Sequence, residues 1–431
     1  MPKTAATYSV LLALALSAPA MASAQDRQYI PYMADSADGA GAESGSQVSS
    51  GTIDQVQFGD VWSQMDVQLP DHTPDAVSTS TSVGNLANAT LKSGDVDSEV
   101  RQSFDAVSRA TNNLEGYSAG TAVSTTTAYA NASSGGTSYG SNSYFAQQDA
   151  EGTVDAYSRV DLFQTNQAAG ATTAIANVST SDNYDGFSIS DQTQYSNADV
   201  TAETDADVYQ NGTSASFATT AGGNASSSTG YTSTDYNRAL QRTESGTRVS
   251  ASTDVYMRDG TNVTAATNSF GNSATVNNEW GYATLGVDGE DTVQDNNADI
   301  DAQSYVTLDQ WNGYATSSAY GVGNSALISN VGSDTVMYAD QTNSGTVTSY
   351  AKLEGASWSG GAGILTSTAI GNAATATVCN YCSEASVGGR INQTNSANIN
   401  AYGQANTSYG GVVQGSATAV GNAATLQSLG N

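Results

Sequence analysis

The sequence predicts an all-β fold, a repetitive β-solenoid or stacked β-hairpin array of about eight repeats of ~48 residues each. Three observations predict it. Two separate marker motifs recur with the same period, the residues around them alternate as in a strand, and no proline follows Pro74. Because proline removes a hydrogen bond from a β-ladder, its absence over this length indicates continuous backbone pairing.

The first marker is an asparagine that follows Gly or Ala among small residues, as in TAIGNAATAT from Thr368 to Thr377. Successive copies lie 46 to 52 residues apart. The marker asparagines are Asn85, Asn131, Asn177, Asn224, Asn272, Asn324, Asn372 and Asn422.

The second marker is a glutamine with a small residue four positions later, Val or Ile six later and often Ala eight later. Its clearest copies begin at Gln148, Gln194, Gln294, Gln341 and Gln393. Weaker copies begin at Gln47, Gln102 and Gln241. Two independent series with one period are hard to produce by compositional bias, so each repeat has a Gln arm and a Gly-Asn arm.

Both arms have the period of two that is typical of strands. In QTNSANINAY every second residue from Ala397 to Ala401 is apolar. In the other arm, Thr368, Ile370 and Asn372 are expected to share one face. Turn-rich stretches connect the arms.

Such small inward residues bury a core only when repeats stack about 4.8 Å apart. Each buried amide then donates to its copy on one side and accepts from its copy on the other, which leaves no buried polar group unpaired. The sequence therefore predicts ladders of Asn and Gln along a thin interior. The alternative is that Gly-Asn marks polar turns. The rod would be about 35–40 Å long with one rung per repeat, or about 75 Å with two.

Residues 1–24 have the pattern of a secretory signal peptide. Lys3 precedes the apolar run Tyr8–Ala20, which is too short for a transmembrane anchor, and Ala22–Ala24 forms a small-residue cleavage site.

Residues 25–46 are expected to form a flexible acidic leader, and residues 47–431 the repeat domain. The segment Asp66–Pro74 is expected to interrupt the first repeat. Only nine residues follow Asn422 and none is charged, so the last repeat is expected to lack the polar cap that solenoids normally carry.

The net charge of −29 disfavours nucleic acid and anionic lipid as partners. No catalytic motif is found: His72, the single histidine, lies in the Pro-flanked stretch LPDHTP, and there is no nucleophile elbow, P-loop or HExxH. We predict that the chain is not an enzyme and needs no cofactor or metal.

Cys379 and Cys382 form a single C-x-x-C. This pair fits a redox motif or half of a zinc site, but a local disulfide is the favoured interpretation in an oxidising compartment. The acidic stretch Val287–Asp301 fits either calcium binding or a solvated strand face, and the latter is favoured because the calcium β-roll motif is absent.

Tyrosines are the suggestive surface feature, because aromatic rings on a regular face stack on sugar rings or on partner proteins. The alternative, to which we give equal weight, is that the tyrosines simply fill the exterior or interior of the solenoid. The tyrosines in or near the strand arms are Tyr350, Tyr381, Tyr402 and Tyr409.

The Gly-Asn and Gln markers are similar to the Gln/Asn-laddered repeats of curli-type fibre subunits, although the period is about twice as long and the frame differs. With its signal peptide, acidic Ala/Ser/Thr/Asn repeats and length, the whole chain resembles the holdfast anchor (attachment) protein D family of stalked alphaproteobacteria. The resemblance rests on composition and repeat style.

The resemblance implies an exported protein at the cell surface, on the extracellular face of the outer membrane. It implies three kinds of partner: the adhesive polysaccharide called the holdfast, other holdfast anchor proteins, and an exporter lipoprotein resembling the curli pore. Self-association is a further expectation.

The predicted function is that of a structural adhesin which anchors an extracellular adhesive polysaccharide to the outer envelope. The alternative is a self-assembling, curli-like functional amyloid or biofilm matrix subunit. A solenoid enzyme such as a polysaccharide lyase is disfavoured, because the 12 Lys and Arg residues are scattered singly.

Overall fold

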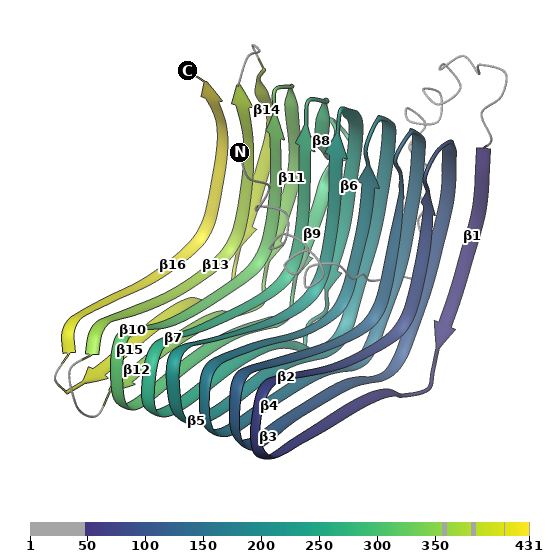
Figure 1. Cartoon of the computed structure of the whole chain (residues 1–431). Coiled ribbons are helices and arrows are strands. Elements are labelled where there is room, and N and C mark those ends of the chain that lie inside the picture. Colours follow the sequence, from purple (N-terminus) through teal and green to yellow (C-terminus); the bar gives the residue numbers. More distant parts are fainter. Residues whose placement is uncertain (1–47, 356–359, 381–384, 409, 431) are drawn as a thin grey trace, which may run out of the picture.

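The computed structural model describes residues 48–355, 360–380, 385–408 and 410–430, so the predicted signal peptide and leader lie outside the described residues. The described chain forms eight stacked coils (Figure 1). Coil 1 is β1 (Val48–Gln57) and β2 (Val61–Leu91); coils 2, 3 and 4 are β3 (Asp95–Thr137), β4 (Gly140–Asn183) and β5 (Gly186–Tyr231); coil 5 is β6 (Ser233–Thr243) and β7 (Arg248–Glu279). Coil 6 is β8 (Ala283–Leu285), β9 (Thr292–Asn296) and β10 (Asp299–Val331); coil 7 is β11 (Thr335–Asn343), β12 (Val347–Gly355) and β13 (Gly360–Asn380); coil 8 is β14 (Val387–Asn395), β15 (Ile399–Thr407) and β16 (Gly410–Gly430).

Each coil pairs in parallel with the next coil, so residues one repeat apart are neighbours across the ladder. This arrangement confirms the all-β, repetitive solenoid fold. Each repeat makes one coil, which selects the shorter of the two expected rods, about 35–40 Å. No described segment is a helix that could cross a membrane.

Each coil is a flattened loop bent into an L (Figure 1). In coil 7 the upright part consists of β11 and the later half of β13, and the lower arm consists of β12 and the earlier half of β13. Large apolar side chains fill the lower arm, including Leu114, Leu162, Phe217, Met257 and Leu308. Ala and Val dominate the cluster next to it. The predicted thin interior of small residues therefore describes only part of the coil.

The Gly-Asn marker lies at the inner corner of the L, within an extended strand. The marker asparagines lie inside strands β2, β3, β4, β5, β7, β10, β13 and β16, so they do not form turns. Ala369 and Gly371 are buried, and so are Asn372 and Ala374, which means that the inward face switches at this pair. The expectation that Asn372 shares a face with Thr368 and Ile370 is wrong, because the strand bends there.

The segment Asp66–Pro74 does not interrupt the first repeat, because it lies within β2. The only irregularity is a register shift between Leu69 and His72. His72 is exposed and its Nδ1 lies 2.9 Å from the Ser118 hydroxyl, so it belongs to a strand rather than to a loop. Strands of this terminal coil have a neighbouring coil on one side only, which explains how they accommodate proline.

Candidate functional site

The structure places all eight marker asparagines in one column, in register from coil 1 to coil 8. Six steps carry an Nδ2 to Oδ1 hydrogen bond of 2.7–2.8 Å, each donated toward the C-terminal coil. At the remaining step, between Asn131 and Asn177, the Asn177 Oδ1 has no partner. The column is thus nearly continuous.

A glutamine column runs beside it, with its hydrogen bonds in the opposite direction. Gln341 donates to Gln294 at 2.6 Å, and Gln393 donates to Gln341 at 2.7 Å, each toward the N-terminal coil. The coil 1 member is Gln55, which pairs with Gln102. The weak copy assigned to Gln47 is therefore misplaced by eight residues, and Gln47 itself lies outside the described residues.

The two columns are linked, because most of the amides also donate to a backbone carbonyl of the opposite arm. Asn372 donates to the carbonyl of Thr394, which follows Gln393, at 2.8 Å. Gln341 donates to the carbonyl of Ala373, which follows Asn372, at 2.9 Å. The amide groups therefore join neighbouring coils and also join the two layers.

Sequence reasoning missed a third amide column, formed by Asn296, Asn343 and Asn395 with steps of 2.7 Å. Each member lies two residues after a marker glutamine, and the repeated Gln-x-Asn was the available signal. This column explains the glycine of three markers, Gly271, Gly323 and Gly371, each of which packs against an asparagine of the third column. A Cβ added to Gly323 would lie 2.3 Å from the Asn343 Oδ1.

The columns are buried in coils 2 to 7, whereas in coil 8 Asn422 is exposed. On the outer surface, aromatic side chains also line up from coil to coil. Phe163 stacks between Tyr117 and Tyr209, with ring centroids 5.1 and 4.7 Å apart. Tyr184 contacts Tyr139 and Tyr231 in a second row.

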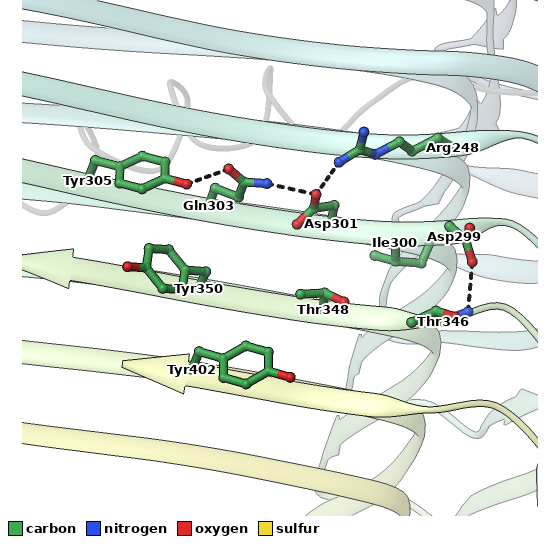
Figure 2. A pocket seen from close by; sticks show the side chains of 10 residues that line it. All are labelled: Arg248, Asp299, Ile300, Asp301, Gln303, Tyr305, Thr346, Thr348, Tyr350 and Tyr402. Atoms are coloured by element: carbon green, nitrogen blue, oxygen red, sulfur yellow. Dashed lines mark hydrogen bonds and ion pairs between the residues drawn. The ribbon is translucent and has the colours of Figure 1, made fainter. Parts of the chain in front are cut away.

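An open groove of about 480 Å³ lies on the outer face of the lower arm across coils 5 to 8 (Figure 2). Its side chains come from β7, β10, β12 and β15, and Tyr350 and Tyr402 are register neighbours in the last two strands. Burial, together with the nearby Tyr350 and Asp301, raises the pKa of Tyr305 above its ordinary value. The groove thus combines three tyrosines with a small polar network.

That network is centred on Asp301, which pairs with Arg248. Gln303 donates to the same carboxylate at 2.8 Å and accepts from the Tyr305 hydroxyl at 2.6 Å. The other carboxylate oxygen, Oδ1, has no partner although Asp301 is only 9% exposed. Asp299 accepts from the backbone N–H of Thr346 at 3.0 Å.

The remaining predicted residues divide into two groups. Tyr381, Tyr409 and Cys382 lie outside the described residues, so the disulfide stays a prediction; Cys379 is half-buried near the end of β13. Tyr350 and Tyr402 line the groove.

The acidic stretch Val287–Asp301 is occupied by cations of the chain itself. Glu290 pairs with Arg238 at 2.8 Å, and Asp291 pairs with Arg390 at 2.8 Å. The described residues contain no group of three or more potential ligands that could hold a metal ion.

Comparison with known proteins gives one finding. The family model described as Holdfast attachment protein D matches residues 70–346, which is more than half of the chain. No curated protein and no solved structure matches. The chain therefore belongs to the holdfast attachment protein D family.

Proposed function

We propose that this protein is a non-enzymatic adhesin that anchors an adhesive extracellular polysaccharide to the outer envelope. The observation that carries the proposal is the match to the holdfast attachment family, combined with a fold that repeats one outer face at about 4.8 Å intervals. Many weak contacts along such a rod add up through avidity.

The amide columns suit a rod that bears load. Sliding one coil against the next would break the backbone ladder and leave several buried amides unpaired at once. The net charge of −29 opposes lateral aggregation of the rods.

In this proposal the protein is exported and lies on the extracellular face of the outer membrane. Its partners are the holdfast polysaccharide, other holdfast anchor proteins and an exporter lipoprotein resembling the curli pore. Nucleic acid is not a partner, since the acidic surface repels it.

Deletion of the gene tests the role. Deletion cells should still make the adhesive polymer but shed it into the medium, and re-expression of the full chain should restore attachment. Normal retention of the polymer by deletion cells would refute the anchoring role. Surface labelling of intact cells, with and without the exporter, checks localisation separately.

Self-assembly is the second candidate function, and one feature of coil 8 favours it. Residues 387–430 contain no Asp or Glu, in a chain with 41 acidic residues, so charge does not oppose pairing with another copy there. Light scattering of the purified chain with and without preformed seeds tests this candidate. Seeded fibres would support it, whereas lasting monomer would exclude it.

A further inference from the structure

The groove on the lower arm presents aromatic rings from three successive coils. The Tyr305 and Tyr350 rings lie 5.5 Å apart and are tilted by 47°, so they do not cover each other as a flat stack would. Tyr402, one coil further on, is 54% exposed. Figure 2 shows the three rings side by side on neighbouring strands. Together they form an apolar platform on an otherwise acidic surface.

Beside the platform lies a polar rim held by Asp301. One carboxylate oxygen of Asp301 accepts from Arg248 and Gln303, which holds both side chains in place. Arg248 lines the groove and its side chain is 58% exposed, so its other N–H groups can donate to the hydroxyl oxygens of a ligand.

The charges around the groove select against anions. Arg248 is neutralised by its ion pair with Asp301, and Asp299 already accepts from the backbone. An anionic ligand would meet two carboxylates in a chain of net charge −29. An uncharged ligand avoids this repulsion, and its hydroxyl groups can bond to the polar rim.

A pyranose ring has both required features, because its C–H face stacks on tyrosine and its rim carries hydroxyl groups. A groove of about 480 Å³ has room for roughly two such rings. We propose that this groove binds an uncharged pyranose segment of the anchored polysaccharide, an inference that rests on the proposed function.

The test measures binding of the full-length purified chain to polymer collected from the medium of deletion cells. Tyr402→Ala removes the most exposed ring of the platform, and Asp301→Asn removes the charge that holds Arg248 and Gln303 in place. We expect each change to weaken binding at least about tenfold.

Tyr314→Ala is the matched control, because Tyr314 is 63% exposed on the same coil as Tyr305 but does not line the groove. The control should bind as the unchanged chain does. Thermal unfolding of all variants distinguishes a loss of ligand contacts from a loss of the folded structure. Tyr402 is largely exposed, so its removal should leave unfolding unchanged.

The outcomes separate the two proposals. If the unchanged chain binds the polymer and the groove variants bind equally well, the groove assignment is wrong and the anchoring role stands. If the unchanged chain does not bind the polymer, direct anchoring itself fails. Affinity that is constant between about 0.02 M and about 0.5 M NaCl indicates an uncharged ligand, whereas a steep fall would overturn that assignment.

Discussion

Coils 2 to 4 and coils 6 to 8 turn the outer corner of the L in different ways. In the first group one uninterrupted strand makes each coil, with 43, 44 and 46 residues in β3, β4 and β5. In the second group every coil is divided into three strands. The divisions between β9 and β10, β11 and β12, and β14 and β15 all fall just after the third amide column.

The side chains of that column explain the difference. Asn343 donates to the carbonyl of Gly345, two residues further along, at 3.0 Å, and Asn395 makes the same bond to Ala397. A local bond of this kind competes with the strand ladder and folds the backbone sharply. The equivalent residues of coils 2 to 4 are Phe104, Ala150 and Ser196, for which the structure shows no such bond. Asparagine two residues after the glutamine thus accompanies a sharp corner in coils 6 to 8, whereas coil 5 breaks its strand after Thr243 with a turn at residues 244–247.

The residue before the marker asparagine at the inner corner depends on the side chain that packs against it from the outer corner. Where the third column holds Asn, the facing residue is Gly, as for Gly323 and Gly371. In coils 2 and 3 the corresponding residues are Ala130 and Ala176. The comparison teaches that the marker has two variants because it must fit the residue packed against it.

The largest effect is expected from adding a methyl group at the sharp corner. Gly323→Ala places a Cβ 2.3 Å from the Asn343 Oδ1 and 2.6 Å from the Gly371 carbonyl oxygen, so it should lower the free energy of unfolding by about 3 kcal/mol. The reverse change in coil 3, Ala176→Gly, should cost about 1 kcal/mol. Urea denaturation measures both. Equal effects would contradict the fit between glycine and the third column.

Breaking the asparagine column should have the next largest effect, and its size should depend on the coil. Asn324 accepts from Asn272 and donates to both Asn372 and Thr342, whereas Asn177 donates twice and accepts nothing. We expect Asn324→Ala to cost about 3 kcal/mol and Asn177→Ala about 2 kcal/mol. Denaturation curves for the two variants test the order, and a larger loss for Asn177→Ala would reverse it.

Buried carboxylates should make the stability of the protein depend on pH in both groups of coils. Burial raises the pKa of Asp235 in coil 5 from 3.8 to about 6, and burial, with Glu151 and Asp105, does the same for Asp149 in coil 3. The folded state then binds more protons, so stability is full below about pH 4 and falls as pH rises through about 6.

We expect Asp235→Asn to remove roughly 2 kcal/mol of that pH dependence, and Asp149→Asn less because Asp149 is more exposed. Thermal unfolding between about pH 4 and about pH 7 measures both changes. An unchanged slope in Asp235→Asn would show that the carboxyl titrates normally.

The smallest effect is expected at the ion pair that links coil 8 to coil 6. Arg390→Ala removes the ion pair with Asp291, in which the arginine side chain is exposed. It should speed amide exchange in β14 and leave global unfolding unchanged. Lys352→Ala in coil 7, whose ion pair is with Glu354 on its own strand, serves as the control. No difference in β14 exchange between the two variants would show that the link is unimportant.

Much of the fold was predictable because the stacking is in register. In a parallel stack with one coil per repeat, the neighbour of Asn324 is the residue one period away. The period of the sequence therefore predicts which residues contact each other along the axis. The repeat number, the strand arms and the grouping of like amides therefore follow from spacing alone. The first glutamine is Gln55 and not Gln47: Gln55 lies 47 residues before Gln102 and keeps the frame, with Gly59 four later and Val61 six later.

The groove shows the opposite case. Tyr350 and Tyr402 stood out as aromatic residues, but nothing in the spacing indicated that Asp301 and Arg248 would lie beside them. Their side chains meet across strands of different coils on an outer face whose direction depends on the bend of the L. The same bend switches the inward face at Gly371 and Asn372, which period-two alternation does not predict.

The sequence by itself determined which residues repeat and therefore which residues stack along the axis, because translation by one coil maps the chain onto itself. Only the tertiary structure decided how the two layers of a coil meet: the opposite directions of the Asn and Gln columns, the corner angle and the groove. These depend on contacts across the coil, where Asn372 reaches Thr394 and Gln341 reaches Ala373. Such contacts join different motifs, and a period relates each motif only to its own copies.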